Sequence, residues 1–413
     1  MSETITDTSA TSRKRRAIPW LSLTVVMCLA AVAAYYWWET RIPRTLRIAG
    51  GPEGGRYLQI AQGLARELRS RHGVLAEVVP TEGSLQNLEL LAQGRVDVCL
   101  YQPETHVILR QASGQAETIA GDESVRFISN LYTEAMIPIV SADDDGHLLQ
   151  HEGSLRIGAN AKRSGDMAMA ILLRRHLGRE QDESSVLTVV PYSQVRETLK
   201  SDDVDIVVIT AGLQAPVIRE TLLSRECRLA DVPLLEAMLA RNPSLRPVTI
   251  PAGYFHTAPG PIPALEFHTV GLPAQLLTAT DVPTRLVEML TEVAMDPQFQ
   301  RGQNLSELFS QGAEFADGES EFPQHPGAEH VFRPELKPLL NPDFVEGTEG
   351  IRSFVVSMLA AIWLCSRWWR RRRILGEEHR LDRFIRRLLE IERRQLDIDG
   401  QNSGDEQCLQ QFL

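Results

Sequence analysis

The sequence predicts an α/β protein with a mostly parallel sheet, held between two membrane segments. Across residues 41–350, short apolar runs that favour strands alternate with short amphipathic helices, which is the pattern of βαβ units. Several of the predicted strands end in glycine-rich turns that open a helix. All six tryptophans lie outside this region, and tryptophan prefers the membrane interface. The 413 residues suffice for roughly two to three domains.

Charge is distributed unevenly along the chain. Residues 41–350 carry 27 Lys or Arg against 42 Asp or Glu, a net charge of −15. An acidic body argues against nucleic acid as a partner. An anionic ligand would therefore have to be bound by local backbone N–H groups and a few arginines, because the overall field repels it.

The first membrane segment is predicted at residues 18–38. This run carries no charge and matches the ~20 residues that cross the hydrocarbon core of a bilayer. Four basic residues at 13–16 precede it, and two tyrosines and two tryptophans at 35–38 close it. We therefore predict a cytoplasmic N-terminus at 1–17 and an uncleaved transmembrane helix at 18–38. A cleaved signal peptide is the alternative.

The body is organised around a glycine-rich turn that follows the first predicted strand, residues 46–49. Gly51, Gly54 and Gly55 stand in this turn, and a helix is predicted over residues 57–70. Backbone N–H groups at a helix start, with the positive end of the helix dipole, suit an anion such as a carboxylate. The turn lacks the Gly-Lys-Ser/Thr of a P-loop and the spacing of a dinucleotide fingerprint. A plain βα turn without a ligand is the alternative.

Two more predicted strands end in polar residues. The strand at 74–79 leads into a turn in which Ser84 takes the expected N-cap position of the next helix. The hydroxyls of Thr81 and Ser84, with the free N–H groups, would form a second polar cradle. The strand at 96–101 ends at Gln102. Ligands of open α/β sheets bind at the carboxyl ends of the strands, where all of these features fall.

Several motifs of the body share their spacing with a known family. They are Gly54-Gly55-x-Tyr57; Thr81-x-Gly83-Ser84-x-x-Asn87-Leu88-x-Leu90-Leu91-x-x-Gly94-x-x-Asp97; Gln102; Leu131-Tyr132-x-Glu134; Gly158 with Ser164-Gly165; and Gly212 with Pro216 after the strand at 204–210. Together they resemble the TAXI family, the extracytoplasmic solute receptors of TRAP-type transporters, over most of residues 45–315. The resemblance implies a two-lobed, type II periplasmic-binding-protein fold that captures a small organic acid or amino acid, with glutamate-like solutes the familiar class.

The second lobe is predicted to contain strands at 155–158, 186–190 and 205–210 and helices at 167–177, 194–199 and 216–223. Two of these helices would begin at the cleft, and closure of the lobes about a hinge would bury the ligand. We predict that the ligand-binding residues are Gly51, Gly54, Gly55, Tyr57, Thr81, Gly83, Ser84, Gln102, Ser164, Gly165, Gln214, Ala215 and Pro216.

The sequence departs from the resembled family at Asp166. Ser-Gly-Thr is usual where this chain has Ser164-Gly165-Asp166. An aspartate at a helix N-terminus can cap the helix, but it also places a negative charge near the pocket, which Lys162 and Arg163 would offset. This departure argues against a simple dicarboxylate ligand.

The rest of the body returns the chain to the first lobe and then to the bilayer. Residues 241–270 are rich in proline and are predicted to form a return loop, and their two histidines lack the spacing and cysteine partners of a metal site. A strand at 270–277 and a helix at 283–295 follow. The solute-binding domain is thus predicted at 41–310, with lobe 1 at about 45–140 and 271–310 and lobe 2 at about 141–270. Residues 311–350 are predicted to be a tether.

Residues 351–369 are predicted to form a second transmembrane helix. The run is short, but Arg367 can extend its side chain to the interface, and residues 370–373 supply a cytoplasmic anchor. An interfacial helix is the alternative. Residues 370–413 are predicted to be a cytoplasmic helical tail. Both termini would then be cytoplasmic, with the body outside the cytoplasmic membrane, and we expect Cys99 and Cys227 in the body to remain free thiols.

The leading functional prediction is a membrane-anchored receptor without catalytic activity or cofactor. It would capture a small anionic or zwitterionic solute for the permease subunits of a TRAP-type transporter. The second prediction is a sensor that uses the same domain and signals to a cytoplasmic partner. An enzyme is the third class, and the presumed cleft shows no Ser-His-Asp, Cys-His or paired-carboxylate set.

Overall fold

The structure is a computed structural model that describes residues 45–114, 122–144, 149, 154–182, 185–337 and 349–396, with five separate residues between 27 and 34. The chain divides into two compact units, one reaching to Asn341 and one beginning at Pro342. The first unit contains the α/β body. Most of residues 18–38, and all of 1–17 and 397–413, lie outside the described residues, so the predictions for these segments remain predictions.

One sheet runs through the whole body. The strands are β1 (Thr45–Ala49), β2 (Leu75–Val79), β3 (Val98–Tyr101), β4 (Val125–Ser141), β5 (Arg156–Ala159), β6 (Val186–Val189), β7 (Ile206–Ala211), β8 (Cys227–Leu229), β9 (Arg246–Ile250) and β10 (Phe267–Ala279). Their order is β2-β1-β3-β10-β4-β7-β5-β6, with β8 paired to β4 and β9 to β10. The pairs β1–β2, β1–β3, β5–β6 and β5–β7 are parallel, as the predicted βαβ units require.

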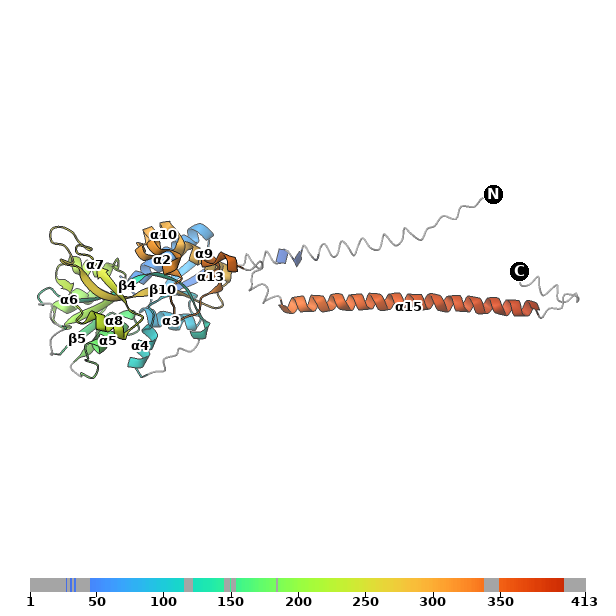
Figure 1. Ribbon diagram of the computed structural model, residues 1–413, viewed down its shortest axis with the longest axis horizontal. Helices are drawn as coiled ribbons and strands as arrows, with labels where there is room; N and C mark the ends of the chain where they lie inside the picture. Colours follow the sequence, from blue (N-terminus) through green and yellow to red (C-terminus); the bar gives the residue numbers. More distant parts are fainter. Residues whose placement is uncertain are drawn as a thin grey trace. The chain divides into compact units, whose positions relative to one another are not determined.

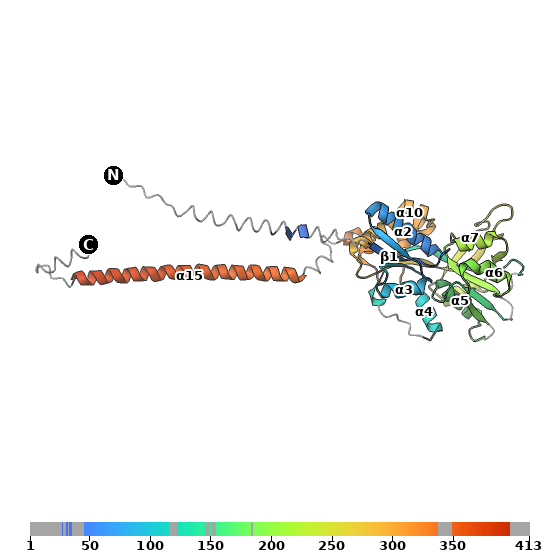
Figure 2. The same ribbon diagram turned by 180° about the vertical axis from the view of Figure 1, so that it is seen from behind.

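Two long antiparallel strands connect the two lobes. The first part of β4 pairs with β10, and from Ala135 onward β4 pairs with β7 of the second lobe. In the same way β10 pairs with β9 at one end and with β3 of the first lobe at the other. Figure 1 labels β4 and β10 where they pass between the lobes, and Figure 2 shows the two lobes from behind, with α2 and α3 in one and α5, α6 and α7 in the other. We call β4 and β10 the hinge strands, and they make the body a two-lobed α/β fold, as predicted.

Helices cover both faces of the sheet. Those of the first lobe are α2 (Arg56–His72), α3 (Ser84–Ala92), α4 (Thr105–Ala112), α9 (Thr284–Met295), α10 (Pro297–Gly302), α11 (Ser306–Gln311), α12 (Ala313–Ala316) and α13 (Pro326–Phe332). Those of the second lobe are α5 (Gly165–His176), α6 (Val195–Lys200), α7 (Pro216–Leu223) and α8 (Leu235–Arg241). The region 241–270 is predicted as a return loop, but it also contains strand β9 and the first residues of β10.

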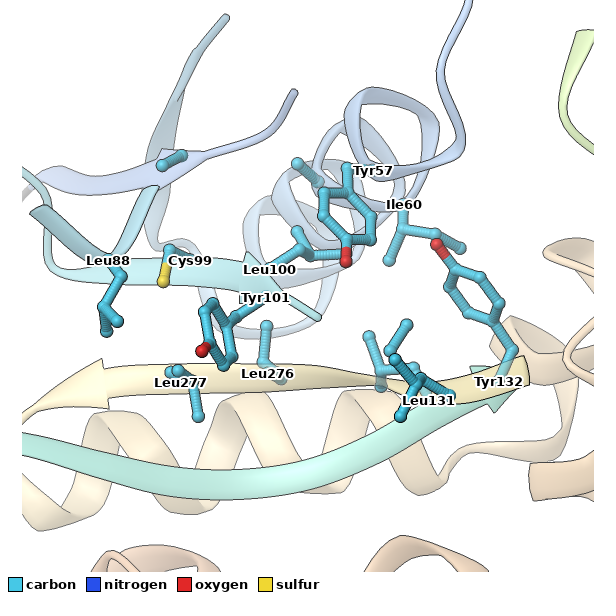
Figure 3. Packing of buried hydrophobic residues seen from close by; sticks show 14 of the residues in the cluster. Tyr57, Ile60, Leu88, Cys99, Leu100, Tyr101, Leu131, Tyr132, Leu276 and Leu277 are labelled. Atoms are coloured by element: carbon cyan, nitrogen blue, oxygen red, sulfur yellow. The ribbon is translucent and has the colours of Figure 1, made fainter. Parts of the chain in front are cut away.

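The core of the first lobe lies between its strands and helices. Figure 3 shows Leu88 of α3, Tyr101 of β3 and Leu277 of β10 packed together, and all three are fully or almost fully buried. Burial of aliphatic and aromatic surface of this kind is the main favourable term in folding. Cys99 and Cys227 are both buried free thiols.

The predicted tether does not fit the structure over residues 313–336. The chain here returns to the first lobe and packs on it. The Phe127 N–H donates to the Pro323 carbonyl, and the His325 N–H donates to the Phe127 carbonyl. Helix α13 packs on α9, and Phe315 of α12 joins the core. The polar, proline-rich composition hid these contacts, because they are made largely by backbone groups and by a few small or apolar side chains.

Gly327 provides a test of this docking. A Cβ added at Gly327 would lie 2.5 Å from the Thr284 carbonyl oxygen and 2.9 Å from the Val287 Cβ of α9. We therefore expect Gly327→Ala to lower the free energy of unfolding by about 1–3 kcal/mol, the usual cost of overpacking. Urea denaturation of the full chain measures it. Gly302→Ala is the control, since a Cβ there meets nothing within 4 Å. Equal stability of the two variants would show that 313–336 is a loose tether after all.

The second unit contains helix α15 (Glu349–Leu396). Residues 351–369 and the first part of the predicted tail thus belong to one continuous helix. Arg367 lies 5.3 Å from the Trp363 ring centroid, and Arg372 lies 4.2 Å from that of Trp368. Within the part of the chain that the structure describes, no helix has both the length and the hydropathy of a membrane span.

Candidate functional site

The candidate site is a cavity between the two lobes, beside strand β4. Its walls come from the turn before α2, the turn before α3, the end of β3, the N-terminus of α5 and the end of β7. Its volume is about 30 Å³, which is enough for about one water molecule. A larger solute therefore needs the lobes to part before it can enter.

Three helix N-termini converge on this cavity. The N-cap residues Gly55 of α2, Gly83 of α3 and Ser164 of α5 all line it. The Ser164 hydroxyl accepts from the Met167 N–H at 3.2 Å and so caps α5. The positive ends of three helix dipoles therefore meet here from both lobes.

Ser84 is not the N-cap that the sequence predicts. Gly83 takes that position with φ at 132°, a value that favours glycine, and Ser84 is the first residue of α3. The Ser84 hydroxyl is free to face the cavity, where it accepts from the Gln102 N–H at 3.1 Å and lies 3.4 Å from the Tyr57 hydroxyl.

The predicted ligand-binding residues fall into three groups. The residues that line the cavity are Gly55, Tyr57, Gly83, Ser84, Gln102, Ser164 and Gly165. Gly51, Gly54 and Thr81 belong to the surrounding turns, where the Thr81 N–H donates to the Gly51 carbonyl and the Thr81 hydroxyl donates to Asn87 Oδ1. Gln214, Ala215 and Pro216 do not line this cavity. Gln214 lines a second cavity, Ala215 is buried in the second-lobe core, and Pro216 begins α7.

Two buried carboxyl groups face the cavity, Glu134 of β4 and Asp166 of α5. Each residue is only 2% exposed. Glu134 accepts from the Tyr57 hydroxyl at 2.8 Å, and Asp166 accepts from the Tyr192 hydroxyl at 2.7 Å and the Thr210 N–H at 2.6 Å. Neither has a basic partner among the described residues. The expected offset of Asp166 by Arg163 is wrong, because the Arg163 guanidinium pairs with Glu82 and Glu89 instead.

Burial controls the protonation of both carboxyl groups. Burial, opposed by the Tyr57 hydrogen bond and assisted by the nearby Asp166 charge, raises the pKa of Glu134 to about 8. Burial likewise raises the pKa of Asp166 to about 7, against the Thr210 and Tyr192 hydrogen bonds. The site can therefore change charge near neutral pH, or stabilise a cation placed between the two carboxylates.

Two polar atoms in the cavity wall lack a protein partner. Gln102 Nε2 and Thr210 Oγ1 are buried and make no hydrogen bond to any described residue. A buried polar atom without a partner is costly, so these two atoms point to a polar group that the cavity receives. Gln102 is among the residues predicted from the sequence, whereas Thr210 is not, because it stands near the end of an apolar strand.

Contacts between the lobes close the cavity. Arg163 Nη2 lies 2.7 Å from Glu82 Oε1, and Arg163 Nη1 lies 3.3 Å from Glu89 Oε2. The Leu85 N–H donates to the Arg163 carbonyl at 3.1 Å. Leu85 is the second residue of α3, so its N–H has no acceptor within that helix. Its protection from hydrogen exchange therefore reports lobe closure.

Charge reversal at Arg163 should open the lobes. Arg163→Glu replaces two attractive pairs by repulsion, a change of about 1–2 kcal/mol at a half-exposed site. We expect the Leu85 amide to exchange about 5–30 times faster, which mass-spectrometric hydrogen exchange can follow. Arg175→Glu is the matched control, because Arg175 pairs with Glu180 inside one lobe. Unchanged exchange in Arg163→Glu would show that these pairs do not hold the lobes together.

The fold and this cavity define a two-lobed α/β protein whose lobes are joined by two long strands and enclose a small polar cavity. The chain belongs to the NMT1-like family, which matches residues 48–335. A search of curated proteins finds no match.

Three solved structures are similar to this chain in fold, each at low sequence identity. The periplasmic aliphatic sulphonate binding protein SsuA from Escherichia coli is 16% identical with a TM-score of 0.39, over 65% of this chain and 75% of that one. Periplasmic binding protein BugD is 13% identical with a TM-score of 0.42, over 64% and 88%. The alkanesulfonate-binding SsuA from Xanthomonas axonopodis pv. citri bound to MOPS is 13% identical with a TM-score of 0.41, over 77% and 94%.

Proposed function

We propose that this protein is an extracytoplasmic receptor that captures a small solute between its lobes and releases it unchanged. The observation that carries the proposal is the interlobe cavity with the unpartnered polar atoms Gln102 Nε2 and Thr210 Oγ1. Capture would proceed by closure about the hinge strands, completed by the Arg163 pairs with Glu82 and Glu89.

The preferred solute is a zwitterion such as an amino acid. The helix N-termini at Gly55, Gly83 and Ser164 favour a carboxylate. The carboxyl groups of Glu134 and Asp166 favour an ammonium group, because each is buried without a basic partner among the described residues. A purely dianionic solute would need both carboxyl groups protonated, so it should bind more weakly as pH rises.

The receptor is proposed to serve a TRAP-type permease and to be held at the cytoplasmic membrane by residues 18–38 and 351–369. The resemblance to TAXI receptors and the basic and tryptophan-rich ends of these segments support this arrangement. A ligand sensor that signals to a cytoplasmic partner through the tail is the second candidate, favoured by the length of α15. Solute uptake into cells that express the chain with its permease supports transport, and uptake unchanged on deletion of the chain supports sensing.

A thermal-shift screen of the full chain in detergent tests the proposed function. Amino acids are compared with the corresponding acids that lack the amino group, for example glutamate with glutarate. A ligand present at 100 times its dissociation constant stabilises the folded state by about 2.7 kcal/mol, so the melting temperature should rise by several degrees. The proposal fails if no small acid or amino acid raises it. Recovery of a chemically altered solute would show an enzyme instead.

A further inference from the structure

A second cavity of about 360 Å³ lies beside the hinge strand β4. Thr133 and Ala135, which flank Glu134 on β4, both line it. Tyr132 lines it too, and the Tyr132 hydroxyl donates to Glu134 Oε1 at 3.4 Å. Arg56 lines both cavities, so the second cavity adjoins the first. Its volume falls within the range of small-molecule sites, and the function proposed above does not use it.

Both lobes contribute to this second cavity, which we call the hinge cavity. Arg56 of α2 and Ser306 of α11 belong to the first lobe, whereas Gln214, Arg246 and Tyr254 belong to the second. A molecule that contacts both sets of residues at once fits only the relative position of the lobes seen here, in which the interlobe cavity is closed. Occupancy of the hinge cavity therefore favours closure.

Two arginines give the hinge cavity its chemical character. Arg56 is only 7% exposed. Its guanidinium donates to Gln59 Oε1 at 3.0 Å and to the Gln303 carbonyl, and it has no carboxylate partner among the described residues. Burial lowers its pKa, the effect expected of a cation without a carboxylate partner. Arg246 is exposed, and no described residue forms an ion pair with it.

The remaining polar groups also suit an anion. The Gln214 amide donates to the Tyr254 hydroxyl at 2.8 Å, which leaves that hydroxyl hydrogen free to donate into the cavity. Glu307 is the one acidic residue in the lining, and it already accepts from the Ser306 hydroxyl at 3.0 Å. The balance in the described lining is thus two cations against one anion, with additional donors.

We infer that the hinge cavity binds a small oxyanion, with a carboxylate, sulfonate or phosphate group, between Arg56 and Arg246, and that this anion stabilises the closed lobes. Arginine is suited to this task because its planar donors match such groups. By linkage, the anion and the captured solute would strengthen each other's binding from two adjoining cavities, both of which Arg56 lines.

Hydrogen exchange of the Leu85 amide in the full chain tests the inference with inorganic phosphate as the probe. Chloride at equal ionic strength is the reference, because it separates specific binding from screening. Phosphate should slow Leu85 exchange by about fivefold or more, the lower end of ordinary coupling between sites. Arg246→Ala should abolish the slowing, and Arg241→Ala, which removes an exposed arginine outside both cavities, should preserve it.

Two results would overturn the inference. One is a phosphate effect that is absent at millimolar concentrations, and the other is an effect of equal size in Arg246→Ala. Neither result bears on solute capture, provided that the thermal-shift screen is also run on Arg246→Ala. Arg246 lines the hinge cavity and not the interlobe cavity, so a rise in melting temperature that persists in this variant reports the interlobe cavity. Conversely, a failed solute screen with an intact, Arg246-dependent phosphate effect would leave the hinge cavity as the functional site.

Discussion

Replacing Glu134 by glutamine is expected to lower the affinity for a zwitterionic solute at least about thirtyfold. Truncation of one member of a buried, hydrogen-bonded charge pair typically costs about 2–5 kcal/mol. Glutamine keeps the size of the side chain and can still accept from the Tyr57 hydroxyl, so the change removes the charge and little else. Isothermal titration of the full chain with the solute found by thermal shift measures the loss.

Glu77→Gln is the matched control for this prediction. Glu77 lies on β2 of the same lobe, is exposed, and lines neither cavity, so its replacement should leave the affinity unchanged. Asp166→Asn should weaken binding in the same direction as Glu134→Gln. Tighter binding of the solute by Glu134→Gln would contradict the account, since it would mean that the site receives an anionic group beside this carboxyl.

Stability of the ligand-free body is expected to fall as pH rises from about 5 to 8. Burial raises the folded pKa of Asp166 to about 7 and of Glu134 to about 8, whereas the unfolded chain releases both protons near pH 4. Between pH 4 and 8 the folded state therefore binds more protons than the unfolded chain, so raising the pH favours unfolding. The stability that the two protonated carboxyl groups contribute is fully present below about pH 4. It is lost as the pH rises through the folded pKa values of about 7 and 8.

The expected slope is about 1.4 kcal/mol per pH unit for each proton held only in the folded state. If the lobes open, water hydrates both carboxylates and their pKa values return toward normal. Lobe opening therefore limits the total loss of unfolding free energy. We expect a decrease of about 2 kcal/mol or more between pH 5 and 8 in urea denaturation. The double variant Glu134→Gln/Asp166→Asn should flatten this part of the profile. A double variant with the same profile as the original chain would show that other groups cause the pH dependence.

The fold was largely predictable because its signals are local. The strand–helix alternation and the turns at Gly54 and Gly83 depend on residues near one another in sequence, and both turns adopt positive φ. The two-lobed arrangement is what the resemblance to TAXI receptors implies, and motifs such as Gln102 at the end of β3 carry that resemblance. These features position the backbone, and the backbone in turn places three helix N-termini at one cavity.

Other parts of the site and of the first lobe could not be predicted, because they depend on packing between residues far apart in the sequence. Strand β4 is buried on both faces, so it lacks the alternation that marks a half-exposed strand. Glu134 belongs to one of the family motifs but is not among the predicted site residues, although a carboxyl group in an otherwise apolar run is a usable signal. Tyr192 offers no such signal, because its contact with Asp166 joins elements 26 residues apart. The docking of residues 313–336 was missed for the same reason.

A crystal structure of the full chain with the solute found by thermal shift tests the central claim most directly. The account predicts electron density for the solute between the lobes, with its ammonium group contacting Glu134 or Asp166 and a polar group contacting Gln102 Nε2. Density for the solute on another surface, with the side chains of Glu134, Asp166 and Gln102 unchanged, would contradict it.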